Sequence, residues 1–216
     1  MKKTETFLLL CGAALLCTSC LGIAADITIR ADGSGKISLE YRVSQMLESL
    51  GRLDGNEGWP AIPVGRADFE RSLSRIPGIR MSFFSSQEKP NALGGRDLVT
   101  NVTLEFANAA ALLAFLDNSG THAAVTQENG KSVLRLAIMD ASAGMFGDDI
   151  LSLMAAVSAG YEVSISFTAP KSAALTIKPQ YVHITRMVSQ GAKVSFAIGM
   201  GELLALKEGL ALEITW

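Results

Sequence analysis

Residue types that often carry chemistry are scarce in this chain of 216 residues. It has three cysteines and two histidines, and aromatic residues make up 6% of it. All three cysteines lie within the first twenty residues, so the rest of the chain has neither a disulfide nor a thiolate metal ligand. A structural zinc site takes about four such ligands, and His122 and His183 stand far apart in the sequence. We therefore expect no metal and no cofactor.

An excess of one charge is also absent. The 19 lysines and arginines are balanced by 21 aspartates and glutamates, which gives a formal net charge of −2. Proteins that bind nucleic acids usually carry a basic surface that neutralises phosphates. The sequence therefore predicts no nucleic acid among the partners.

Recognisable catalytic motifs are missing as well. No G-x-S-x-G nucleophile elbow occurs, and neither histidine lies in a motif typical of a catalytic triad. The adjacent acids Asp148 and Asp149 could share a proton or bind a metal, but aspartates at a predicted helix start usually cap free N–H groups. The Gly-Met-Gly stretch at 199–201 lacks the third glycine and the lysine of nucleotide loops, which favours a turn into a short helix. We predict that the protein is not an enzyme.

The N-terminal apolar segment, residues 7–16, is too short to span a bilayer. It covers about ten residues and follows Lys2 and Lys3, whereas a membrane-spanning helix needs roughly 20. A short basic start followed by such a segment is typical of a secretory signal peptide. An uncleaved signal anchor is the alternative interpretation.

The cysteines at the end of this segment decide where the signal is cut. Signal peptidases need small side chains before the cut, and Cys20 follows Thr18 and Ser19, whereas Cys11 and Cys17 each follow a leucine. A redox C-x-x-C motif belongs beside a strand–helix unit in a folded domain, not after an apolar leader. We therefore predict lipidation, such as a palmitate, at Cys20. The predicted parts are a signal peptide at 1–19, a lipidated tether at 20–25 and a single domain at 26–216.

This cleavage region resembles the lipobox of bacterial lipoproteins. It departs from the usual pattern at Cys17, where leucine is common, and relaxed boxes of this kind resemble those of spirochaetes. The resemblance implies a membrane-anchored protein of the cell envelope, in the periplasm or on the cell surface, at the outer membrane in a bacterium with two membranes.

Hydrophobic periodicity predicts a repeated order of two strands followed by a helix. The strand pairs expected are 26–30 with 36–43, 79–85 with 97–106, and 121–127 with 131–137. Turn signals support the hairpins, namely Asp-Gly-Ser-Gly at 32–35 and Asn129-Gly130. A polar loop is expected at 87–96.

Helices are predicted where apolar residues return every third or fourth position. The expected ranges are 43–50, 66–76, 108–116 and a helix from about 148, and Asn108 is the expected N-cap. Strand patterns dominate from 162 to 216, with one short helix at 202–206. Antiparallel hairpins with helices packed on one face give an α+β fold.

Four large apolar residues lie in predicted loops. Trp59 and Ile62 follow a glycine-rich stretch, and Met145 and Phe146 approach the predicted helix at 148. Large apolar side chains on loops can mark a ligand or membrane contact, or they can fold back as lids on the core. We take these four residues as candidate ligand-binding residues.

The strand–turn–strand Asp-Ile-Thr-Ile-Arg-Ala-Asp-Gly-Ser-Gly-Lys-Ile-Ser-Leu-Glu-Tyr at 26–41, with a late strand closed by Pro170, resembles bacterial lipoproteins with an LppM-type domain. The resemblance implies an α+β envelope domain that binds lipids or glycolipids. The expected function is thus a lipid-anchored, non-enzymatic lipoprotein that binds a lipid or other apolar ligand. The alternatives are a protein-interaction or structural module, such as an assembly factor or adhesin, and, third, an envelope hydrolase.

Overall fold

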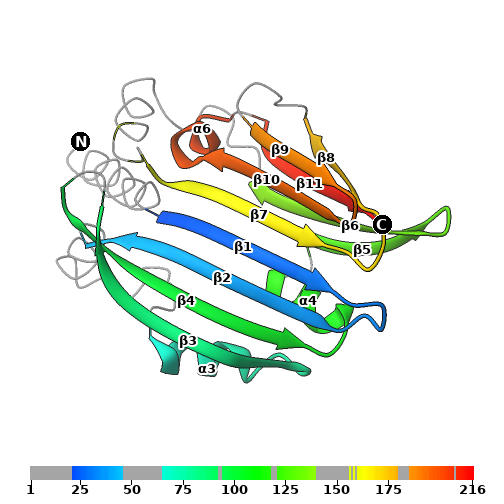
Figure 1. Cartoon of the computed structure of the whole chain (residues 1–216), viewed down its shortest axis with the longest axis horizontal. Helices are drawn as coiled ribbons and strands as arrows, with labels where there is room; N and C mark the ends of the chain where they lie inside the picture. Colours follow the sequence, from blue (N-terminus) through cyan, green and yellow to red (C-terminus); the bar gives the residue numbers. More distant parts are fainter. Residues whose placement is uncertain are drawn as a thin grey trace, which may run out of the picture.

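The computed structural model describes residues 21–45, 65–91, 94–117, 121–139, 156, 158, 160–179, 185–206 and 208–216. These residues form a seven-stranded sheet, a four-stranded sheet and three short helices (Figure 1). The predicted α+β class is therefore confirmed.

The large sheet has the strand order β3-β4-β2-β1-β7-β10-β9. Its strands are β1 (Leu21–Ile29), β2 (Gly35–Ser44), β3 (Ile79–Pro90), β4 (Arg96–Phe106), β7 (Glu162–Thr168), β9 (Thr185–Gln190) and β10 (Lys193–Gly199). The pairing is antiparallel except between β1 and β7, which are parallel. The sheet is therefore mixed, and its centre joins the first strands of the domain to the C-terminal part.

The small sheet has the order β5-β6-β11-β8 and is antiparallel. Its strands are β5 (Ala123–Glu128), β6 (Lys131–Met139), β8 (Ala174–Lys178) and β11 (Leu210–Thr215). Leu212 of β11 and Phe196 of β10 belong to one buried cluster, in which each is 1% exposed. The small sheet therefore covers the β7–β10 half of the large sheet.

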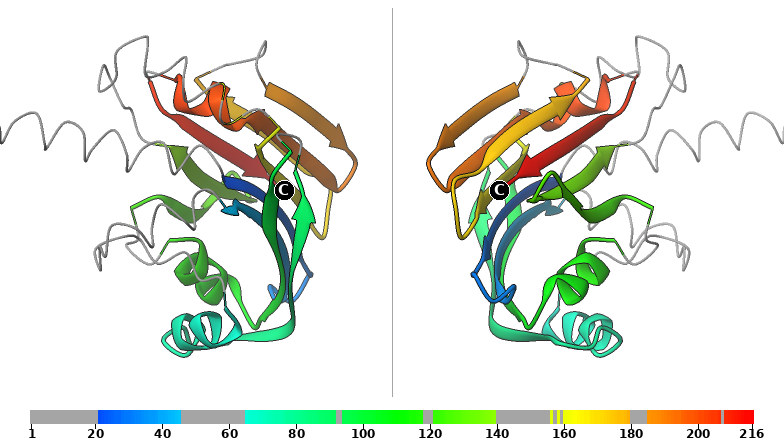
Figure 2. Two further views of the ribbon diagram at one scale, coloured as in Figure 1. Left: turned by 90° about the vertical axis from the view of Figure 1, so that its left-hand side faces the viewer. Right: turned by 90° about the vertical axis from the view of Figure 1, so that its right-hand side faces the viewer.

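Helices cover the other half of the same face. They are α3 (Arg66–Leu73) and α4 (Ala109–Leu116), and a third helix, α6 (Met200–Leu204), follows β10. Figure 2 shows α3, α4 and the small sheet on the same side of the large sheet. Phe69 of α3 and Leu112 of α4 pack in the cluster that contains Leu104 of β4. No helix in the described part of the chain is long and apolar enough to cross a membrane.

Local sequence signals predicted several features correctly. Asn108 is the N-cap of α4, where its side chain accepts a hydrogen bond of 3.0 Å from the N–H of Ala111. Asn129 and Gly130 join β5 to β6 with φ values of 53° and 75°, as a tight hairpin turn requires. Gly199 is the N-cap of α6, which starts at Met200, and its N–H donates to the Glu202 carboxylate, so the Gly-Met-Gly stretch leads into a short helix.

Several boundaries differ from the prediction, two of them by four residues or more. β1 begins at Leu21 rather than at 26, so residues 21–25 of the predicted tether are part of the sheet. The reason is that Leu21, Ile23 and Ala25 continue the inward alternation of the strand. The polar loop predicted at 87–96 is also shorter, because β3 runs to Pro90 and β4 begins at Arg96. Cross-strand pairing there overrides the polar composition.

Candidate functional site

The predicted site residues lie outside the described part of the chain. This applies to Cys20 and to the four loop residues Trp59, Ile62, Met145 and Phe146. The acidic pair at 148–149, the rest of the helix predicted there and His183 also lie outside it. Their roles remain predictions.

An apolar pocket lies between the large sheet and the two helices that cover it. It has a volume of about 430 Å³ and is lined by residues of β1, β2, α3, the segment after α3, and α4. We call it the sheet–helix pocket. The α+β fold class predicts a groove between sheet and helices. The candidate residues predicted in the loops are not among those that line this pocket.

The floor of the sheet–helix pocket is formed by two neighbouring strands. Leu21 and Ile23 come from β1 and Leu39 and Tyr41 from β2, and Ile23 lies directly opposite Tyr41. Alternation along both strands directs these side chains to the inner face. Further along the same face Ile37 is 0% exposed, whereas Leu21, Ile23 and Leu39 are only half-buried. The inner face is thus closed at one end and open at the other.

Helix α3 forms the first wall through an aromatic cluster. The ring of Phe69 lies 5.8 Å from the ring of Tyr41 and 5.9 Å from that of Phe84 in β3. The guanidinium of Arg66 lies over the Phe84 ring at 5.5 Å. Such ring contacts stabilise beyond the area that they bury. They fix α3 on the sheet, so that Leu73, one turn after Phe69, also faces the pocket.

Helix α4 supplies the second wall. Ala114 and Phe115 line the pocket, and both are half-buried, whereas Leu112 of the same helix is fully buried. The chain enters α4 through the Asn108 cap described above. The part of α4 next to the cap therefore packs in the core, and its later residues border the cavity.

The hydroxyl of Tyr41 has no hydrogen-bond partner among the described residues. The residue is 8% exposed, and the oxygen is buried. Burial raises the pKa of Tyr41, and the negative charge of Asp68 raises it further. The group therefore stays a neutral O–H donor. A buried donor without a partner costs roughly 1–3 kcal/mol.

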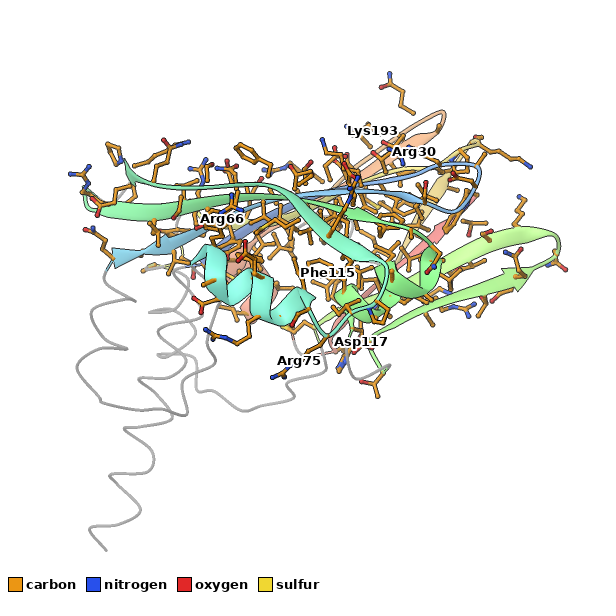
Figure 3. The ribbon with its side chains drawn as sticks, turned by 90° about the horizontal axis from the view of Figure 1, so that it is seen from below. Arg30, Arg66, Arg75, Phe115, Asp117 and Lys193 are labelled. Atoms are coloured by element: carbon orange, nitrogen blue, oxygen red, sulfur yellow. The ribbon has the colours of Figure 1, made fainter. Side chains whose placement is uncertain are left out.

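Polar residues stand at the rim of the pocket. Ser72 and Arg75 line it and are exposed. Within the described residues Arg75 has no hydrogen bond or ion pair, while the other arginines of those residues each have one. Figure 3 shows Arg75 and Phe115 on the helix side of the sheet, with Arg75 pointing away from the strands. The pocket thus combines an apolar interior with a cation at its rim that has no partner among the described residues.

A second hollow, of about 250 Å³, is polar and lies on the opposite face. Its charged residues pair with one another or with their surroundings, as Arg42 does with Glu40 at 3.0 Å and Glu162 does with Arg186. Tyr161 closes one side and donates a hydrogen bond to Asp97. The charged side chains that line this hollow are therefore already paired within the described part of the chain. We assign these contacts a structural role.

His122 is the one histidine among the described residues, and its contacts differ from those of a catalytic triad. Thr121 Oγ1 lies 2.8 Å from its Nδ1, and Asp117 Oδ1 lies 3.8 Å from the same nitrogen. A triad needs the acid and the hydroxyl on different ring nitrogens. Asp117 instead accepts from the backbone N–H groups of His122 and Ala123. No cluster of three potential metal ligands occurs within the described part of the chain.

Some pocket residues could be anticipated in part from the sequence. Phe69 and Leu73 fall on one face of the helix predicted at 66–76, where a core stripe and a pocket wall give the same periodicity. Tyr41 shares one face of the strand predicted at 36–43 with Ile37 and Leu39, but alternation alone does not show that this face borders a pocket. Arg75 gave no signal, because nothing in the sequence shows that an arginine lacks a partner.

No family model matches the chain, and no curated protein matches it. The resemblance to LppM-type lipoproteins therefore remains a prediction, and the function has to be argued from the sheet–helix pocket.

Proposed function

We propose that the protein is a lipid-anchored, non-enzymatic lipoprotein of the cell envelope that binds a lipid or another apolar ligand. The observation that carries this proposal is the sheet–helix pocket, whose volume of about 430 Å³ falls in the range of roughly 300–1,000 Å³ of small-molecule sites. Its lining is aliphatic and aromatic, with few polar groups, as such sites usually are.

Energetics favour a ligand that fills the pocket. Ten methylene groups gain roughly 8 kcal/mol at about 0.8 kcal/mol each, and association costs roughly 4–15 kcal/mol. A short apolar molecule would therefore bind weakly, and a long acyl chain would gain enough. The half-buried side chains of Leu21, Ile23, Leu39 and Phe115 supply the apolar surface that such a chain would cover.

The predicted lipid anchor at Cys20 lies next in sequence to a residue that lines the sheet–helix pocket. β1 begins at Leu21, and Leu21 lines the pocket. Consecutive Cα atoms are about 3.8 Å apart, so a lipid on Cys20 would attach directly beside the strand that forms the pocket floor. A protein arranged in this way would hold its pocket close to the membrane that supplies the ligand.

Mass spectrometry of lipids extracted from the purified chain tests the proposal. We expect a co-purifying lipid, and displacement of a fluorescent fatty acid by added lipid. Ala114→Trp fills the pocket with an indole and should abolish binding. Ala110→Trp, an exposed position of α4 outside the lining, is the matched control and should bind normally. A chain that never carries or binds lipid would exclude the proposal.

The alternative is a protein-interaction module, and one observation favours it. β9 is an edge strand of the large sheet, with Met187 44% and Val188 57% exposed. Exposed edges with apolar side chains pair readily with other chains. A photo-crosslinker at Val188 that captured one dominant protein in cells would support this function, and capture of none would count against it.

A further inference from the structure

We infer that the ligand of the sheet–helix pocket is a single-chain lipid with an anionic head group. Its acyl chain fills the pocket, and its head group accepts hydrogen bonds from Arg75. This inference rests on the proposed function and names the ligand class of the same site.

The volume of the pocket accommodates one acyl chain. A water-sized group occupies roughly 30 Å³ in a liquid, so a cavity of about 430 Å³ has room for about fourteen methylene-sized groups, which is the size of one acyl chain of ordinary length.

The rim of the pocket selects an anionic head group. Arg75 lines the rim, and within the described residues it forms no ion pair or hydrogen bond. Every other arginine of those residues has a partner, including Arg71 in the last turn of α3, whose guanidinium lies 3.4 Å from the Asp68 carboxylate. An arginine guanidinium binds phosphates and carboxylates through two parallel hydrogen bonds. Arg75 is therefore the cation available to an anion at this pocket.

The floor of the pocket receives the acyl chain. Leu21 and Ile23 line it and are half-buried, so an acyl chain lying on them would remove apolar surface from water.

The test compares two probes that share one acyl ester. They are 1-lauroyl-glycerol-3-phosphate and 1-monolauroylglycerol, which lacks the phosphate, each titrated below its micelle concentration into the full chain carrying Cys20→Ala. We expect the phosphate lipid to bind at least tenfold more tightly. Arg75→Gln should remove this preference, because a charge-assisted hydrogen bond accounts for a factor of roughly ten to a hundred. Arg71→Gln, four residues earlier in α3 and outside the lining, should keep it.

Two outcomes would overturn the inference and leave the proposed function intact. They are equal binding of the two probes to the wild-type chain, and a preference for the phosphate lipid that survives Arg75→Gln. If neither probe binds, the proposed function itself fails.

Discussion

The hydroxyl of Tyr161 donates a hydrogen bond of 2.7 Å to Oδ1 of Asp97, and both side chains are buried. The contact joins the residue before β7 to the beginning of β4, 64 positions apart in the chain. Asp97 also accepts a hydrogen bond of 2.8 Å from the side chain of Asn91. A buried carboxylate is thus held by donors from two parts of the large sheet.

Removal of the Tyr161 hydroxyl should destabilise the fold. Tyr161→Phe keeps the ring but leaves a buried carboxylate oxygen with one donor fewer. We expect a loss of roughly 1.5–3 kcal/mol, the usual contribution of a hydrogen bond to a charged group, measured by urea unfolding. A change below the error of that measurement would show that water replaces the hydroxyl without cost.

The same substitution at Tyr41 should instead raise the free energy of unfolding. The Tyr41 hydroxyl is buried without a partner, so Tyr41→Phe removes an unmatched donor and keeps the ring contact with Phe69. We expect the ligand-free protein to gain about 1 kcal/mol. The two tyrosines serve as controls for each other in one urea series. A loss of stability in Tyr41→Phe would mean that the hydroxyl has an acceptor inside the protein.

Gly35 should tolerate no side chain. A Cβ atom there would lie 2.0 Å from the carbonyl oxygen of Thr28 and 2.2 Å from Cζ of Phe106. The carbonyl belongs to the paired strand β1 and cannot move away cheaply. We expect Gly35→Ala to cost about 3 kcal/mol or more.

Gly22 provides the matched control for Gly35, because it lies in the partner strand of the same hairpin. A Cβ atom there would lie 3.5 Å from its nearest neighbour, Cδ1 of Tyr161, which is an ordinary contact. Gly22→Ala should change the free energy of unfolding far less than Gly35→Ala. Similar losses in both variants would contradict the steric explanation.

Part of the fold follows from the sequence because it is local. The hairpin of β1 and β2, the cap at Asn108 and the turn at Asn129 depend on neighbouring residues, and the structure has all three. The parallel pairing of β1 with β7 was not predictable. Alternation shows that Val163 and Ile165 face the core, but the same alternation suits any partner strand.

The candidate site was less predictable than the fold. The pocket combines residues from 21 to 115, and their proximity results from the order of strands in the sheet. Periodicity marks Phe69 and Leu73 as apolar and inward-facing, and it cannot distinguish a filled core from an open cavity. The unmatched state of Arg75 and of the Tyr41 hydroxyl appears only when the surroundings of each group are known.

The small sheet should lose stability in acid through Glu213. Hydrogen bonds from Lys178 and Arg135, at 2.9 and 3.2 Å, hold the pKa of Glu213 below its ordinary value of 4.5. A lowered pKa stabilises the folded state above the ordinary value, and this contribution is lost as the pH falls through the lowered pKa. We expect Glu213→Gln to lower the melting temperature at pH 7. The difference from wild type should vanish in strong acid, and a constant difference would exclude the ion pairs as its cause.

Cys20, the predicted anchor, is followed directly by the first strand of the large sheet. Leu21 is the first residue of β1 and pairs with Val43, so a lipid on Cys20 would connect to the sheet without a spacer. Cys20→Ala should release the protein from membranes and stop labelling by an alkynyl fatty acid, because no other predicted acceptor remains. Cys17→Ala is the control and should keep both properties, since that residue leaves with the signal peptide. Labelling that persists in Cys20→Ala and disappears in Cys17→Ala would show that the modified cysteine is Cys17, and that a tether of three residues separates the lipid from the pocket floor.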